Sequence, residues 1–370
     1  MWRTTEGSTG RLIQLCIGYF VFYVITGITV KYFLSHGMEG MEFLVYSTAG
    51  GSLIVFPVVV GLKWYRLASN RTVRFAGLDV PSELAYIIPS GICTAVVIPT
   101  TTLMYTLPIT VMVAMTMMRG SVIVISRVVD AIQIRQGILD KKVYLEENLA
   151  VASALAGVGV HIFYGAREKG GFDFVGDTAA MTIFISYIAS YALRIYLMNY
   201  FKNTRAKGIK LDNKGFFALE QFAATATLVL GTAAVLVLVH GEERVELVRG
   251  AITNPIDGWG WATLAGTAFG AAAFFSVFLF MFKGRTATFA GLVNRLTSLI
   301  AGTTATIGSW LFFSGRRPSP QDWEALAFIL IAVALLAKAE RKRAAELAAR
   351  GEIAEVRDRR NAPGDQHRPR

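Results

Sequence analysis

Two arginines in the middle of long apolar runs have the clearest chemical consequence in this sequence. Arg119 lies about eleven residues into the run 108–128, and Arg295 lies about nine residues into the run 286–313. At a rise of about 1.5 Å per residue, both would lie deep in a membrane, where an ionised side chain is costly. Neither has an acidic residue three or four positions away. Because a guanidinium fork suits phosphate or carboxylate, we expect these arginines to hold an anionic substrate group. The alternative is that each ties helices together through backbone carbonyls or Glu220.

Three further charged residues lie nearer the ends of apolar runs. Arg194 is deep in its run but within reach of one end, so it could bind substrate or extend to the membrane surface. Lys31 is close to an end of the first run, where a gate, a lipid headgroup contact and substrate binding are all compatible with its flexible stem. Glu220 could carry a proton, neutralise a cation in an empty site, or serve as a helix-terminal acid.

Tyrosines recur at helical spacing in two of the runs. Tyr19 and Tyr23 lie one turn apart, as do Tyr187 and Tyr191. In a cavity, phenol rings stack on planar groups and their hydroxyls form hydrogen bonds. Tyr23 also shares a helix face with Lys31. Tyr23 and Tyr191 are therefore candidates for substrate contact, with simple packing as the alternative.

The sequence shows no pattern of a catalytic, cofactor or metal site. It contains no Walker loop, no Rossmann fingerprint and no nucleophile elbow. His161 and His240, which each end a run, are not part of a helical metal-binding pair. Two cysteines are too few for a disulfide framework or a thiolate metal cluster. We therefore expect no catalytic residues, no cofactor and no metal.

The elements that must position these residues are membrane-spanning helices. Of 370 residues, 54% are hydrophobic and only 17% are charged, and the mean hydropathy is +0.47. Soluble domains carry about 25% charged residues, so the composition disfavours an ordinary cytosolic enzyme. A span needs about 20 apolar residues, too long for the strands of a β-barrel. Ten apolar runs meet this requirement: 12–34, 41–62, 83–105, 108–128, 147–164, 177–201, 216–240, 259–282, 286–313 and 320–338.

The basic residues indicate the orientation of these runs. With the N-terminus inside, 27 of the 37 lysines and arginines lie on the inner side, six on the outer side and four within the runs. Cytoplasmic loops carry the excess of positive charge, so both termini are expected in the cytoplasm. The Ala- and Arg-rich tail favours a bacterial plasma membrane, with a eukaryotic endomembrane as the alternative. The expected divisions are a cytoplasmic N-terminus (1–11), two five-helix groups (12–164 and 177–338) and a charged cytoplasmic tail (339–370).

The two groups of five runs resemble each other. An offset of 168 residues aligns the two tyrosine pairs. An offset of 176 aligns Arg119 with Arg295, and one of 178 aligns Glu42 with Glu220. Because each group has an odd number of spans, the second must insert upside down relative to the first. This predicts an all-α membrane protein of ten helices in two inverted repeats, with a site near the midplane between them.

Two stretches carry a resemblance to a known family. The stretch 117–124, with Arg119-Gly120-Ser121 at its centre, resembles the fourth span of nucleotide-sugar-transporter-like members of the drug/metabolite transporter superfamily. The stretch 294–299, which begins Asn294-Arg295, is similar to their ninth span. The resemblance covers residues 12–338 and implies ten spans with both ends cytoplasmic, and organic-metabolite transport. Nucleotide-sugar carriers exchange their substrate for a nucleotide monophosphate. The Gly-Ala-Leu-Asn-Lys motif of GDP-mannose carriers is absent.

These observations together predict a secondary transporter that works by alternating access on a small organic anion, such as a nucleotide sugar or another phosphorylated or carboxylated metabolite. The alternatives are a proton-coupled exporter of neutral or cationic metabolites, with Glu220 as the proton carrier, and a membrane scaffold without transport. A scaffold would satisfy its buried arginines with protein groups, whereas a carrier would place them at a water-accessible cavity.

Expected partners are the substrate and the lipid bilayer, without nucleic acid. Gly266-x-x-x-Gly270 leaves open whether it serves packing within one chain or a homodimer. The candidate substrate-binding residues are Arg119, Arg295, Arg194, Tyr23, Tyr191, Asn294 and Lys31.

Overall fold

The computed structural model describes residues 9–361, except for 76, 141, 165–171, 207, 210, 281–286 and 314. This part of the chain contains eleven α-helices and a two-stranded antiparallel hairpin. The elements, in chain order, are α1 (Thr9–Ser35), α2 (Gly40–Gly61), β1 (Thr72–Phe75), β2 (Leu78–Pro81), α3 (Leu84–Thr106), α4 (Val111–Arg135), α5 (Leu145–Tyr164), α6 (Thr178–Asn203), α7 (Asn213–Leu238), α8 (Glu243–Thr253), α9 (Trp259–Phe280), α10 (Ala287–Phe312) and α11 (Pro320–Asn361).

Each of the ten apolar runs coincides with one of the long helices. Seven of these helices, α1 to α4, α6, α7 and α9, are long and apolar enough to cross a membrane, judged on the described residues. This finding fits a multi-pass α-helical membrane protein. The hairpin and the short helix α8 are additions that the apolar pattern does not predict. Residues 281–286, which include the end of the run 259–282 and the start of the run 286–313, and most of the N-terminal segment 1–11 lie outside the described residues.

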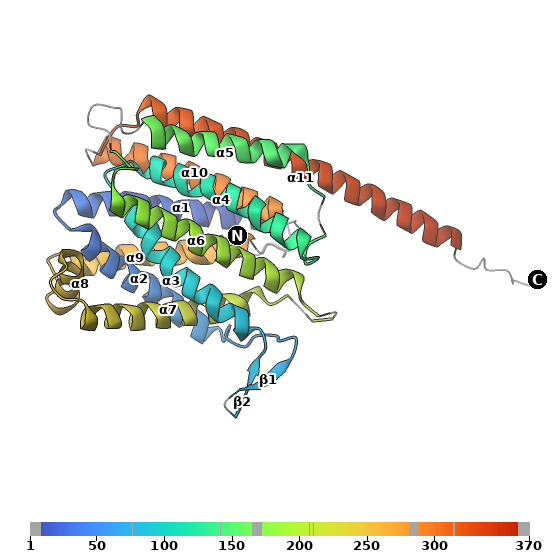
Figure 1. Cartoon of the computed structure of the whole chain (residues 1–370), viewed down its shortest axis with the longest axis horizontal. Helices are drawn as coiled ribbons and strands as arrows, with labels where there is room; N and C mark the ends of the chain where they lie inside the picture. Colours follow the sequence, from blue (N-terminus) through green and yellow to red (C-terminus); the bar gives the residue numbers. More distant parts are fainter. Residues whose placement is uncertain are drawn as a thin grey trace, which may run out of the picture.

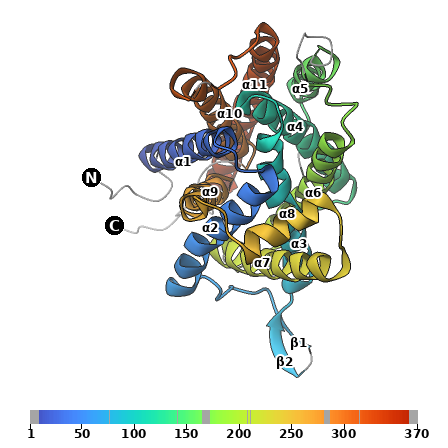
Figure 2. The ribbon, with the colours of Figure 1, turned by 90° about the vertical axis from the view of Figure 1, so that its left-hand side faces the viewer.

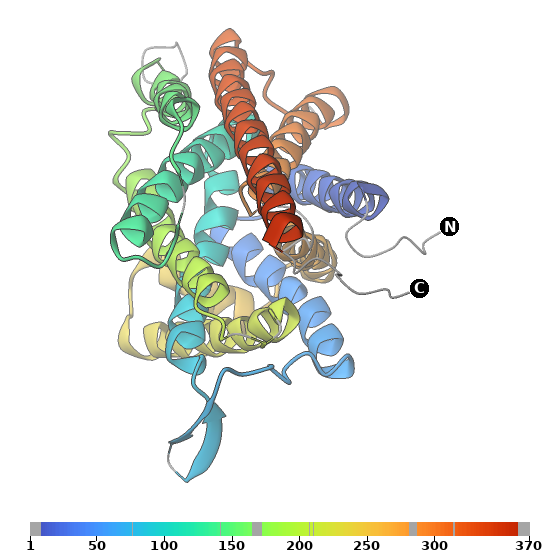
Figure 3. The ribbon, with the colours of Figure 1, turned by 90° about the vertical axis from the view of Figure 1, so that its right-hand side faces the viewer.

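The long helices lie side by side in one bundle (Figure 1). The connections 62–83, 136–144 and 204–212 gather at one end, which we call the basic end, and α8 lies at the opposite end. Figures 2 and 3 view the bundle from its two ends. The hairpin projects from the bundle in both views, and α5 packs against α11. Helix α11 continues unbroken from Pro320 to Asn361, so it joins the tenth apolar run to the described part of the charged tail, and it extends past the bundle.

Glycines bring α2 and α9 into close contact. A Cβ at Gly50 would overlap the carbonyl oxygen of Thr263, and a Cβ at Gly266 would overlap that of Ser47. Gly270 lies against the backbone of α2 in the same way. Small residues allow such close approach of helix backbones in a membrane. The Gly266-x-x-x-Gly270 spacing is therefore used for packing within the chain.

The two helices at the edge of the bundle are joined by charged groups at the basic end. Glu146 and Glu147, in the first turn of α5, pair with Lys342 and Arg343 of α11. Acidic residues in a first helical turn also complement the positive end of the helix dipole. These pairs attach the part of α11 that follows the predicted span to the start of α5.

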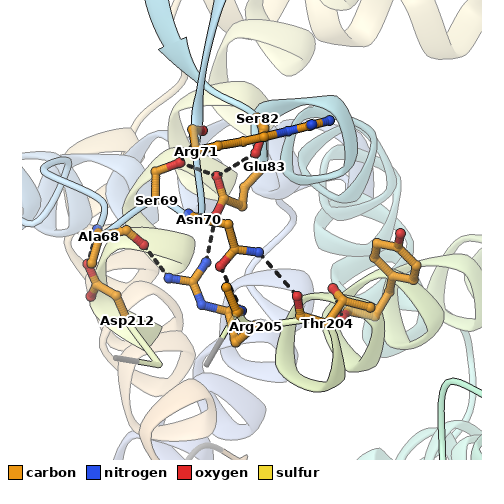
Figure 4. A network of polar contacts seen from close by, with 11 residues as sticks. Ala68, Ser69, Asn70, Arg71, Ser82, Glu83, Thr204, Arg205 and Asp212 are labelled. Carbon is orange, nitrogen blue, oxygen red and sulfur yellow. Dashed lines mark hydrogen bonds and ion pairs between the residues drawn. The ribbon is translucent and has the colours of Figure 1, made fainter. Parts of the chain in front are cut away.

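A buried polar network anchors the α2–α3 connection to the α6–α7 connection at the basic end (Figure 4). Glu83, which is fully buried, accepts hydrogen bonds from Ser69 Oγ and from the backbone N–H of Asn70, both at 2.5 Å. Arg205 donates to the same carboxylate at 2.7 Å and to the carbonyl oxygen of Ala68. Its guanidinium carbon also lies 4.8 Å from the centroid of the Phe201 ring.

Two further contacts complete this network. The side chain of Asn70 donates to the carbonyl oxygen of Thr204 and accepts from the N–H of Ala206. Asp212, the N-cap of α7, accepts from the N–H of Ala68 at 3.0 Å. Burial by itself would raise the pKa of Glu83, but the hydrogen bonds from Ser69 and Asn70 and the charge of Arg205 hold that pKa below its ordinary value. Glu83 is therefore a structural anion.

Candidate functional site

A cavity lies inside the bundle, lined by residues of α1, α2, α3, α4, α6, α7 and α9. The cavity has a volume of about 110 Å³, counted as the space that the centres of water molecules can reach. This is enough room for several water molecules. Arg119, Arg194 and four tyrosines contribute to its wall. Much of the remaining polar lining consists of hydroxyl groups, from Thr48, Ser52, Thr94, Thr101, Thr225 and Ser276.

Arg119 reaches this cavity from α4 and is 94% buried by its neighbours, with a relative exposure of 6%. Its Nη2 donates to the hydroxyl of Tyr23 at 2.6 Å and, more weakly, to that of Tyr19 at 3.5 Å. The guanidinium carbon lies 5.5 Å from the centroid of the Tyr23 ring. Nε and Nη1 make no hydrogen bond with a described residue.

The surroundings of Arg119 leave its charge unbalanced. Within the described part of the chain, no carboxylate forms an ion pair with it, and its partners are neutral phenols. A buried cation without an anion is costly, and a guanidinium has five N–H donors to satisfy. An anionic ligand in the cavity would supply both the missing charge and the missing acceptors.

Arg194 also lines the cavity, but its charge is paired. Its Nε and Nη2 donate to the two carboxylate oxygens of Glu220, at 2.9 Å and 2.8 Å. The hydroxyl of Ser90 donates to Glu220 as well, at 2.6 Å. Glu220 is fully buried behind Arg194 and is not part of the described cavity lining. Arg194 therefore points to an intramolecular partner and does not extend to the membrane surface.

The two tyrosine pairs both lie at the cavity. The rings of Tyr19 and Tyr23 are 5.0 Å apart between centroids and meet edge to face, and those of Tyr187 and Tyr191 are 5.2 Å apart. Tyr105 of α3, which is buried and is not among the described lining residues, donates to the Tyr23 hydroxyl at 3.2 Å. Tyr19 and Tyr23 thus orient Arg119, and both tyrosine pairs contribute aromatic surface to the cavity wall.

Arg295 is not among the described residues that line the cavity, so the two arginines do not share it. Its Nη2 donates to Ser126 Oγ and, at 3.5 Å, to the carbonyl oxygen of Val122, both on α4. Arg295 therefore contacts the facing helix α4, whereas Arg119 contacts α1.

Two other predicted residues lie outside the cavity wall. Lys31 donates to the carbonyl oxygen of Leu107, the residue that caps the end of α3, at 2.9 Å. Such a contact satisfies an exposed helix carbonyl and complements the negative end of the dipole. Asn294 lies behind Ser276, to which its amide donates at 3.0 Å. Lys31 thus holds the end of α3, and Asn294 holds Ser276, a residue of the cavity wall.

Sequence reasoning missed Tyr105 and the hydroxyl-bearing wall of α3. A periodicity signal was available for part of it, because Thr94 and Thr101 are seven residues apart and so lie on one helix face. Neither a family model nor a curated protein sequence matches the chain. The functional assignment therefore rests on the geometry of the cavity.

Proposed function

We propose that this protein is a secondary transporter that moves a small organic anion by alternating access, with Arg119 as the primary anion-binding group. The observation that carries the proposal is the state of Arg119, which is buried, lacks an acidic partner among the described residues and lies on a water-accessible cavity. A scaffold would satisfy such a cation internally, because an unpaired buried charge reduces stability without a compensating gain. In a carrier, the bound anionic substrate would balance the charge of Arg119.

The packing of the helices supports an inverted repeat. If α1 is matched with α6, α2 with α7, α3 with α9, α4 with α10 and α5 with α11, the most extensive helix contacts exchange with one another. The α2–α9 contact becomes α7–α3, the α1–α9 contact becomes α6–α3, and the α1–α10 contact becomes α6–α4. The α5–α11 and α4–α10 contacts map onto themselves. Such exchange is expected for a twofold axis in the membrane plane.

Individual contacts follow the same exchange. Gly91 of α3 lies against the carbonyl oxygen of Glu220 on α7, and Gly266 of α9 lies against that of Ser47 on α2. The offset is then 175 residues between α3 and α9, and 173 between α2 and α7. By this criterion Ser47, and not Glu42, corresponds to Glu220. The Arg194–Glu220 ion pair therefore belongs to one repeat only.

An apolar cluster supports a gated cavity. Val55, Phe217 and Val277 line the cavity and also belong to a buried cluster that joins α2, α7 and α9 toward the basic end. Trp64 extends this cluster, with its ring 5.5 Å from that of Phe278 and 5.4 Å from Nζ of Lys214. Alternating access would require these three helices to separate. The cluster is the barrier that would open.

The direct test is transport in liposomes. Purified protein would be reconstituted with an unlabelled anion inside, and uptake of labelled anions outside would be followed for sugar phosphates, sugar sulfates, nucleoside monophosphates, nucleotide sugars and small carboxylates. We expect counterflow of at least one of these anions above protein-free liposomes. Absence of counterflow and of ligand-induced thermal stabilisation for every class would contradict the proposal.

A further inference from the structure

The Arg194–Glu220 pair sets the charge that the cavity presents to a ligand. Among the described residues that line the cavity, the side chains charged at neutral pH are Arg119 and Arg194. The charge of Arg194 is balanced by Glu220, which is not among the described lining residues, through two hydrogen bonds at 2.9 Å and 2.8 Å. Among the described residues of the cavity wall, Arg119 therefore carries the one positive charge without an acidic partner.

The carboxylate of Glu220 is held in place by three hydrogen-bond donors. It is fully buried, it accepts from Ser90 at 2.6 Å in addition to both Arg194 donors, and Gly91 of α3 packs against its backbone. The hydrogen bonds of a bidentate arginine–carboxylate pair are charge-assisted and roughly twice as strong as neutral hydrogen bonds. A ligand would have to break two charge-assisted hydrogen bonds to take the charge of Arg194 for itself.

Arg194 can still contact a ligand without leaving Glu220. Its Nη1 makes no hydrogen bond with a described residue, and the side chain lines the cavity together with the hydroxyl groups of Thr94 and Thr101 on α3. It can therefore donate a hydrogen bond to a ligand while its net charge remains balanced. Thr48 Oγ1, buried and without a hydrogen-bond partner among the described residues, is a further group available to a hydroxyl-bearing ligand.

We infer that the substrate is a hydroxyl-bearing monoanion, and that Glu220 is the residue that excludes dianions by neutralising Arg194. This inference rests on the proposed function and narrows its substrate class. A second negative charge on the ligand would be buried without a free cation, which is unfavourable in a low-dielectric site. Removal of the Glu220 charge would release Arg194 and give the cavity two positive charges. Glu220 is thus a specificity-determining residue.

The test compares two ligands of nearly equal shape and different charge. At pH ~8, glucose 6-sulfate is a monoanion and glucose 6-phosphate is a dianion, because the second pKa of a phosphate ester is about 6. Equilibrium binding of each to the detergent-purified full-length protein gives a preference ratio. We expect the wild type to prefer the sulfate ester by about tenfold or more, the size of one lost charge-assisted contact.

The Glu220→Gln variant should reverse this preference in favour of the phosphate ester. Glu220→Met removes the same charge with an apolar side chain of similar length and serves if the first variant does not fold. The double variant Arg194→Met with Glu220→Met leaves only Arg119 and should retain the wild-type preference for the monoanion. Glu83→Gln, which neutralises a buried acid at the basic end, is the matched control and should not change the ratio.

The outcomes separate this inference from the proposed function. If anions bind but the ratio is the same in wild type and Glu220→Gln, the charge-setting role is refuted while an anion carrier still stands. If neither Glu220 variant folds, the pair is a structural tie and the inference is overturned. If no anion of either class binds the wild type, the proposed function itself fails.

Discussion

Two buried arginines in this molecule have opposite surroundings. Arg205 at the basic end contacts a fully buried carboxylate, a backbone carbonyl and an aromatic ring, all supplied by the fold. Arg119 in the cavity contacts two phenol hydroxyls and leaves two of its nitrogens without a hydrogen bond to a described residue. Both side chains are largely excluded from solvent.

This is the difference expected between a structural arginine and an arginine that binds a ligand, the role that we propose for Arg119. A buried cation with an anionic partner strongly resists loss of that partner, because the remaining charge would be left uncompensated. A buried cation with neutral partners gains by acquiring an anion from outside. The two sites are therefore expected to respond in opposite ways when the arginine is removed, and the predictions below are designed to expose that contrast.

The largest effect is expected from Arg205→Met. This change leaves the Glu83 carboxylate buried without its cation, which typically lowers the free energy of unfolding by about 3–5 kcal/mol. Thermal unfolding in detergent would measure it. The double variant with Glu83→Met should recover a large part of the loss. Equal instability of the single and double variants would show that the ion pair is not the source of the effect.

The next effect concerns ligand affinity at Arg119. Arg119→Lys retains the charge but loses the planar fork, and a charge-assisted hydrogen bond is worth about 1.5–3 kcal/mol. Affinity for the best anion should therefore fall by about 10- to 150-fold. Arg295→Lys is the matched control, because Arg295 is similarly buried but lies outside the described cavity wall. A comparable loss of affinity in both variants would contradict the assignment of the site to Arg119.

A smaller effect is expected on acidification. Because the pKa of Glu83 is lowered in the folded protein, its contribution to stability is fully present above its unfolded-state pKa and is lost as the pH falls through its folded value. The midpoint of thermal unfolding should therefore fall more steeply toward acidic pH in the wild type than in Glu83→Gln. Parallel pH profiles would indicate that Glu83 is not a structural anion.

The fourth prediction concerns Tyr23→Phe. The change removes the 2.6 Å acceptor of Arg119 while keeping the ring, and a hydrogen bond to a charged group contributes about 1.5–3 kcal/mol. Stability of the ligand-free protein should fall by this amount. Tyr191→Phe removes a phenol at the cavity that makes no hydrogen bond with a described residue and should be nearly neutral. Identical effects of the two changes would remove Tyr23 from the Arg119 network.

The helices could be predicted from sequence because membrane thickness imposes a length that apolar runs record directly. The hairpin could not be predicted in this way. Its strands have four residues each, too short for an alternating pattern to stand out, and its turn depends on Gly77 with a positive φ of 82°. Helix α8 is short and amphipathic, so it lies below the length that marks a span.

The site was predictable only as a set of residue types. Arg119, Arg194 and the tyrosine pairs were identified because charged and phenolic side chains are rare or periodic in apolar runs. Which arginine faces the cavity depends on the rotation of each helix, which the apolar pattern does not fix, and Arg295 contacts Ser126 and Val122 of α4 instead. The pairing of Arg194 with Glu220 joins residues 26 positions apart on two helices, a contact that no local spacing encodes.

The most direct test of the account is thermal unfolding of Arg119→Met with and without the best-binding anion. The wild type should be stabilised by the anion through preferential binding to the folded state. The variant should be as stable as the ligand-free wild type or more so, because it no longer buries an uncompensated charge, and the anion should not shift its midpoint. A marked fall in the ligand-free midpoint, or an anion-induced shift equal to that of the wild type, would contradict an anion site at Arg119.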